Sequence, residues 1–105
     1  MCRVMNDYEE ELAAVSAELE ISKKEILGNT RPGDVALARQ VFYYVLRVRG
    51  RSYGEIAKML KKSKSTVSRG VALIEFERGH GGWMEGVIEG IEERLKKLKR
   101  RVDKC

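Results

Sequence analysis

Helix start and stop signals recur along this chain, and they restrict it to an all-α fold. Ser22 and Ser52 each precede a glutamate by three residues, which is the capping-box pattern at a helix start. Gly28 and Gly50 follow stretches of helical periodicity, as glycines that end helices do. The only proline is Pro32, and no stretch shows the alternation of β-branched residues that is typical of strands. We therefore expect helices throughout.

Apolar positions spaced three and four apart predict about six helices. We expect them near 6–20, 22–28, 34–50, 52–60, 64–78 and 83–101. Asn6 or Asp7, Asp34 and Ser63 are the expected caps of the first, third and fifth helices. The 105 residues are one domain's worth of sequence, so we predict a single domain, with its core at about 34–78 and a long C-terminal helix after it.

The last predicted helix carries a heptad seam of apolar residues. The seam consists of Met84, Ile88, Ile91, Leu95, Leu98 and Val102. A seam of this length either packs on its own domain or joins two copies in a homodimer. The sequence leaves both readings open.

Positive charge is concentrated in the middle of the chain. The formal net charge is +5, yet residues 31–70 contain ten basic residues against only Asp34 and Glu55. Such a cluster produces a local field that attracts polyanions such as nucleic acid. The alternative is the solvated face of a basic protein.

The stretch Gly54–Val71 predicts a helix-turn-helix. Two short helices joined by a tight turn would bury Ile56, Ala57 and Leu60 against Val67, Gly70, Val71 and Ile74. The opposite face of the second helix then presents Lys64, Ser65, Ser68 and Arg69 as candidate readers of bases in the major groove of double-stranded DNA. A helical hairpin that is polar only for solubility would show the same pattern.

The residue types on this face suit the recognition of DNA. Arg69 can engage guanine in bidentate fashion and Lys64 as a single donor, whereas the hydroxyl of Thr66 can bond a phosphate. Ser63, as the N-cap, leaves backbone N–H groups for a phosphate. Further candidate backbone contacts are Lys61 and Lys62 in the turn and a stripe of Arg39, Tyr43 and Arg47 on the third helix. Tyr43 either packs or presents its hydroxyl to a phosphate.

The chain also resembles a known family from about Tyr8 to Glu77. Its landmarks are Lys24-Glu-Ile-Leu-Gly28, Leu37-Ala-Arg-Gln-Val-Phe-Tyr-Tyr-Val-Leu-Arg47, Ser52-Tyr-Gly-Glu-Ile56, Ser65-Thr-Val67 and Ile74-Glu75. In these it is similar to the C-terminal DNA-binding domain of the bacterial replication initiator DnaA. The resemblance implies a Trp-repressor-like helical bundle, with Arg31 in the minor groove. It further implies that Arg39 and Gln40 contact the backbone and that residues 64–66 read the major groove.

The sequence departs from this family at the recognition turn. The family places Asp-His before its Ser/Thr-Thr-Val run, where this chain has Ser63 and Lys64, and Lys61-Lys62 replaces a glycine-rich turn. No G-x-x-x-x-G-K-[ST] pattern occurs, so we expect no nucleotide and no initiator ATPase. A stand-alone DnaA-related regulator, or an accessory factor of replication or transposition, fits this chain better.

Other functions have little support in the sequence. The single histidine, His80, lies among glycines, and Cys2 and Cys105 show no zinc spacing, so we expect no metal, no cofactor and a reducing cytoplasmic, nucleoid-associated location. No apolar run is long enough for a membrane span, and no nucleophile–base pair suggests an enzyme. Trp83 is expected to anchor the core rather than stack on bases. The alternative function is a helical protein–protein interaction or dimerisation module acting through the last helix.

Overall fold

The described residues form six helices, which confirms the all-α prediction. The computed structural model describes residues 8–28, 33–80 and 82–102, with side chains from 8 to 97. The helices are α1 (Glu9–Leu19), α2 (Lys23–Leu27), α3 (Gly33–Val48), α4 (Tyr53–Leu60), α5 (Lys64–Gly79) and α6 (Trp83–Val102), and no strand occurs among the described residues. Arg31, the proposed caps Asn6 and Asp7, and both cysteines lie outside the described residues.

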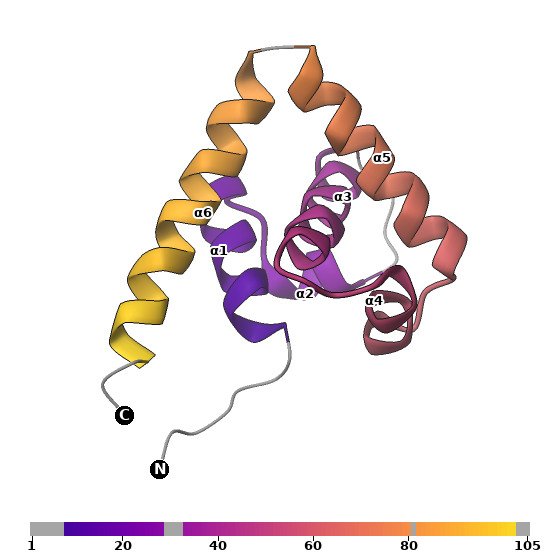
Figure 1. Ribbon diagram of the computed structural model, residues 1–105, viewed down its shortest axis with the longest axis horizontal. Helices are drawn as coiled ribbons and strands as arrows, with labels where there is room; N and C mark the ends of the chain where they lie inside the picture. Colours follow the sequence, from indigo (N-terminus) through magenta and orange to yellow (C-terminus); the bar gives the residue numbers. More distant parts are fainter. Residues whose placement is uncertain (1–7, 29–32, 81, 103–105) are drawn as a thin grey trace.

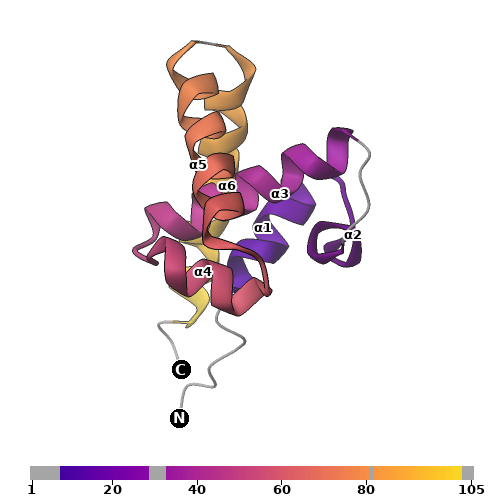
Figure 2. The ribbon, with the colours of Figure 1, turned by 90° about the vertical axis from the view of Figure 1, so that its right-hand side faces the viewer.

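The helix α3 lies at the centre of the fold. In Figure 1, α5 and α6 form the two long sides of an inverted V, with α3 between them, α1 beside α6, and α4 below α5. Turned by 90°, α5 and α6 extend together beyond the other helices (Figure 2). Eight residues of α3 are buried: Val35, Ala38, Val41, Phe42, Tyr43, Tyr44, Val45 and Leu46. All of them except Val35 belong to one hydrophobic cluster to which all six helices contribute.

The heptad seam of α6 packs inside this cluster. Met84, Ile88, Ile91 and Leu95 are all at most 3% exposed, and α6 packs mainly along α1. Ion pairs fasten α1 on both sides: Arg94 Nε lies 3.0 Å from Glu18 Oε1, and Arg49 Nε lies 2.7 Å from Glu11 Oε2. The described part of the seam therefore packs on its own domain. The side chains of Leu98 and Val102 lie outside the described part.

Local signals set most helix starts. The Ser22 and Ser52 hydroxyls accept hydrogen bonds from the backbone N–H groups three residues on, and Ser52 with Glu55 completes a capping box. Two starts differ from expectation. Asp34 lies inside the first turn of α3 rather than before it, where its charge still favours the positive end of the helix. The described α1 begins at Glu9, and Tyr8 precedes it without a side-chain cap.

The expectation that Trp83 anchors the core is wrong. Its side chain is 55% exposed at the start of α6. The next residue, Met84, takes the buried position at this end of the helix and is 0% exposed. Adjacent helical residues point about 100° apart, and only the face of α6 that carries Met84, Ile88, Ile91 and Leu95 is buried, so Trp83 points away from the core.

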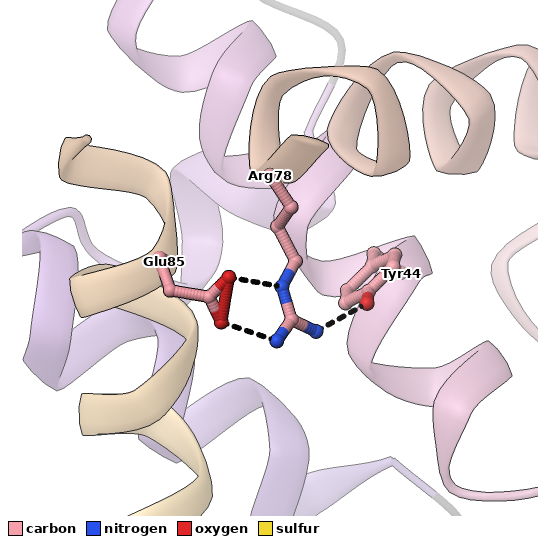
Figure 3. Close-up of polar contacts among 3 residues, drawn as sticks. All are labelled: Tyr44, Arg78 and Glu85. Atoms are coloured by element: carbon pink, nitrogen blue, oxygen red, sulfur yellow. Dashed lines mark hydrogen bonds and ion pairs between the residues drawn. The ribbon is translucent and has the colours of Figure 1, made fainter. Parts of the chain in front are cut away.

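A polar cluster joins α3, α5 and α6 (Figure 3). The Arg78 guanidinium donates two hydrogen bonds to the Glu85 carboxylate, one of them 3.3 Å from Nε to Oε2, and a third from Nη1 to the Tyr44 hydroxyl at 2.6 Å. This hydrogen bonding lowers the pKa of Glu85 and raises the pKa of Arg78. The cluster holds the far end of α5 against α6 and α3.

The Glu85 interaction predicts a pH dependence of stability. Because the folded state lowers the pKa of Glu85 below its ordinary value of 4.5, its contribution is complete above that pH and is lost as the pH falls further. Glu85→Gln should lower the Tm at pH 7 and have a much smaller effect at pH 3, as measured by circular dichroism. The matched control is Glu89→Gln, at an exposed position of the same helix. A Tm difference for Glu85→Gln that is equal at both pH values would contradict the assignment.

Candidate nucleic-acid interface

The helices α4 and α5 form the predicted helix-turn-helix. Ile56 and Ala57 of α4 are buried together with Val67 and Val71 of α5. The chain turns at Lys61, whose φ of 56° places it in the left-handed region. The Lys62 N–H donates to the Ala57 carbonyl at 2.9 Å and closes the end of α4. The turn is therefore tight, although it contains no glycine.

The first turn of α5 is an exposed set of hydroxyl groups ordered by its cap. Ser63 Oγ accepts a hydrogen bond from the Thr66 N–H at 3.1 Å, and it lies 2.7 Å from Thr66 Oγ1 and 3.3 Å from Ser65 Oγ. All three side chains are exposed. The first turn of α5 contains no acidic residue, so the positive end of the helix is not neutralised from within it. This end of α5 is suited to a negatively charged ligand.

The predicted base-reading residues lie on the accessible side of this helix. Lys64, Ser65 and Arg69 are exposed, and Ser68 is half-buried. Among the described residues, none pairs with the charged groups of Lys61, Lys64 or Arg69. Their cations therefore remain available to phosphates or base edges. No residue-level observation tests the base contacts themselves, which stay a prediction.

The predicted basic stripe on α3 does not form as an exposed surface. Tyr43 is only 4% exposed, so the aromatic member packs in the core. Arg39 donates from Nε to the Ile26 carbonyl at 3.0 Å and from Nη2 to the Glu25 carbonyl at 2.9 Å, so it secures the end of α2. The guanidinium of Arg47 lies 5.1 Å from the centre of the Tyr53 ring. Arg39 therefore contacts α2, and Arg47 contacts the first residue of α4.

A cavity of about 220 Å³ between α3 and α5 brings several predicted residues together. Its lining includes Arg39 and Gln40 from α3 with Thr66 and Arg69 from α5. Arg47 is separate from this group, because it lies eight residues or about 12 Å further along α3. Arg31 lies outside the described residues. The sequence reasoning missed Leu73 on the cavity wall, although its spacing of four from Arg69 could have placed it there.

The sequence of this chain matches a known protein family. Residues 9–74, from α1 into α5, match the family model described as the bacterial DnaA protein helix-turn-helix. The chain belongs to this family. The match confirms the resemblance found in the sequence, and it identifies a DNA-binding domain rather than a catalytic one. The part of the chain that contains α6 lies beyond the matched residues.

Two chromosomal replication initiator proteins DnaA are similar to the chain. The protein from Kosmotoga olearia is 33% identical over 91 residues, which cover 83% of this chain and 18% of the relative. The protein from Pseudothermotoga lettingae is 43% identical over 56 residues, which cover 52% of this chain and 13% of the relative. The chain thus spans less than a fifth of the length of either relative.

Residues 8–28, 33–80 and 82–102 contain neither a membrane-spanning helix nor a metal-binding cluster. No helix in these ranges has the length and apolar character needed to cross a membrane. The same ranges hold no group of three or more histidine, cysteine or acidic residues placed to bind a metal ion.

The left-handed conformation of Lys61 predicts that two substitutions at this position differ in stability but not in their effect on DNA binding. A side chain costs about 1–2 kcal/mol in this region, and glycine avoids most of that cost. Lys61→Gly should therefore raise the free energy of unfolding by about 1 kcal/mol relative to Lys61→Ala. Both variants should weaken DNA binding equally, because both remove the same charge.

Urea unfolding and a DNA titration of the two variants check this prediction. Glu20→Gly against Glu20→Ala is the matched control, because Glu20 has the same φ of 56° at the end of α1. Equal stability of the two Lys61 variants would contradict the interpretation.

Proposed function

We propose that the chain is a sequence-specific double-stranded DNA-binding protein, a stand-alone DnaA-related regulator or an accessory factor of replication or transposition. One observation carries the proposal. The start of α5 is exposed, contains no acidic residue in its first turn, and presents Lys64 and Arg69 without an ionic partner among the described residues. A helix of this kind in a helix-turn-helix enters the major groove with its first turns.

The proposed contacts divide into readers and positioners. Lys64, Ser65, Ser68 and Arg69 read base edges, and Arg31 enters the minor groove. The contacts that hold the backbone come from Arg39, Gln40, Arg47, Lys61, Lys62, Ser63 and Thr66. Phosphate contacts supply affinity without sequence information, whereas base contacts supply the preference for one site.

A protein–protein module acting through α6 has less support. Four residues of its seam, Met84, Ile88, Ile91 and Leu95, are already buried in the domain. A homodimer through these residues would require α6 to leave α1 and expose the core. A dimer that left the core intact would need another surface of the chain.

The DNA-binding proposal predicts a steep dependence of affinity on salt. If Arg31 in the minor groove together with Arg39, Arg47, Lys61 and Lys62 at the backbone neutralises about five phosphates, log K against log salt should have a slope of about −4 to −5. The duplex should come from selection out of a random duplex library by the purified protein. A slope near zero on the selected duplex would contradict the backbone contacts.

Two substitutions separate reading from positioning. Arg69→Ala should relax the preference at one base pair, with a loss of about 1–3 kcal/mol on the selected site. Lys61→Ala should weaken binding to all sequences alike. Titration of a panel of duplexes with single base changes measures both effects. Identical behaviour of the two variants on every duplex would overturn the division of roles.

A further inference from the structure

Tyr43 is buried, yet its hydroxyl has no hydrogen-bond partner among the described residues. The side chain is 4% exposed, and every hydrogen bond found among these residues belongs to other groups. The hydroxyl oxygen itself is not enclosed in the core, so it can bond water or a ligand in the cavity that the residue lines. Burial raises the pKa of Tyr43, although the charge of Arg39 opposes this in part. The hydroxyl is therefore protonated at neutral pH and can donate.

Tyr43 lines the cavity between α3 and α5, whose walls suit an anion. The other polar side chains of the lining are Arg39, Gln40, Thr66 and Arg69. These provide two guanidinium groups, an amide and a hydroxyl, and no carboxylate lines the cavity. Its volume of about 220 Å³ is several times the ~30 Å³ that one water molecule occupies in the liquid. The cavity therefore has both the charge and the room for a phosphate group.

The close approach of α5 fixes the Tyr43 ring in place. A Cβ atom on Gly70 would lie 3.0 Å from Tyr43 Cδ2 and 3.4 Å from Gln40 Cγ. Only glycine lets α5 cover the ring at this distance without displacing it. The ring is thus held between the two helices.

We propose that this cavity seats one phosphodiester of the DNA backbone and that the Tyr43 hydroxyl donates a hydrogen bond to it beside the Arg69 guanidinium. The inference rests on the proposed function, because it gives one phosphate of the bound duplex a defined position. Thr66 and Arg69 place the cavity next to the exposed start of α5, so a strand that borders the recognition helix passes it. Leu73, 46% exposed on the cavity wall, offers an apolar contact to the adjoining sugar.

The test combines one hydroxyl deletion with single changes in the DNA. Tyr43→Phe removes only the oxygen and keeps the ring beneath Gly70. Dissociation constants are measured for wild type and variant on the selected duplex, and on a series in which each phosphate in turn is replaced by an uncharged methylphosphonate. Tyr44→Phe is the matched control, since its hydroxyl bonds Arg78 and its residue lines no part of this cavity.

Tyr43→Phe should weaken binding about tenfold on every base sequence, as expected for a lost hydrogen bond to a charged group. Its Tm should stay that of the wild type, because the hydroxyl makes no hydrogen bond in the free protein. At one methylphosphonate position, the wild type should weaken and the variant should lose little more. Tyr44→Phe should instead lower the Tm and leave DNA affinity unchanged.

Two results would overturn the inference while leaving the proposed function intact. One is wild-type affinity of Tyr43→Phe on every duplex. The other is a loss that adds fully to the effect of every methylphosphonate, which would show that the hydroxyl contacts no phosphate. Absence of saturable duplex binding by the wild-type protein would remove the proposed function and this inference together.

Discussion

The burial of α3 is the constraint on which the rest of the structure depends. Eight of its residues are enclosed, and α1, α2, α4 and α5 all pack against it. Its polar side chains also act as fasteners: Arg39 holds the end of α2, and Tyr44 accepts a hydrogen bond from Arg78 of α5. The orientation of α5 relative to the other helices is thus set by one helix that itself contributes few exposed side chains.

The two ends of α5 have opposite roles. Its last turns are held through Arg78 to Glu85 and Tyr44 (Figure 3). Its first turn is exposed and carries the hydroxyl groups arranged by Ser63. A helix of 16 residues is about 24 Å long, so a fixed far end limits how much the near end can tilt. The helix α6 thereby supports α5 without approaching its first turn.

Local features of the sequence predicted the fold better than they predicted the surface. The starts of α2, α4 and α5 followed from Ser22, Ser52 and Ser63, because a cap acts within three residues. Spacing also identified the buried faces of α3 and α6. Spacing could not show that Tyr43 is buried. The helical period gives the direction in which a side chain points from the helix axis, but it does not give the number of helices that pack around that helix. α3 has helices on several sides, so a residue outside its main apolar face is buried as well.

The same limit applies to the candidate site. The sequence singled out Arg39 and Arg69 for their charge, but it gave no reason to place them on one cavity, since that depends on how closely α5 crosses α3 at Gly70. The two hydrogen bonds from the Arg39 guanidinium to carbonyls of α2 were equally unpredictable, because every residue has a backbone carbonyl and the sequence does not show which of them accept. Contacts between distant parts of the chain therefore came only from the structure.

The exposed position of Trp83 determines what fluorescence can report on this protein. It is the only tryptophan in the chain, and it lies at the start of α6, more than half in contact with solvent. Because the indole is more than half exposed, its emission should resemble that of a hydrated indole already in the native state, and unfolding should change it little. A blue shift would instead report that another molecule has covered the end of the molecule where α5 and α6 converge (Figure 2). The fluorescence of Trp83 is therefore suited to reporting binding at this surface rather than unfolding of the core.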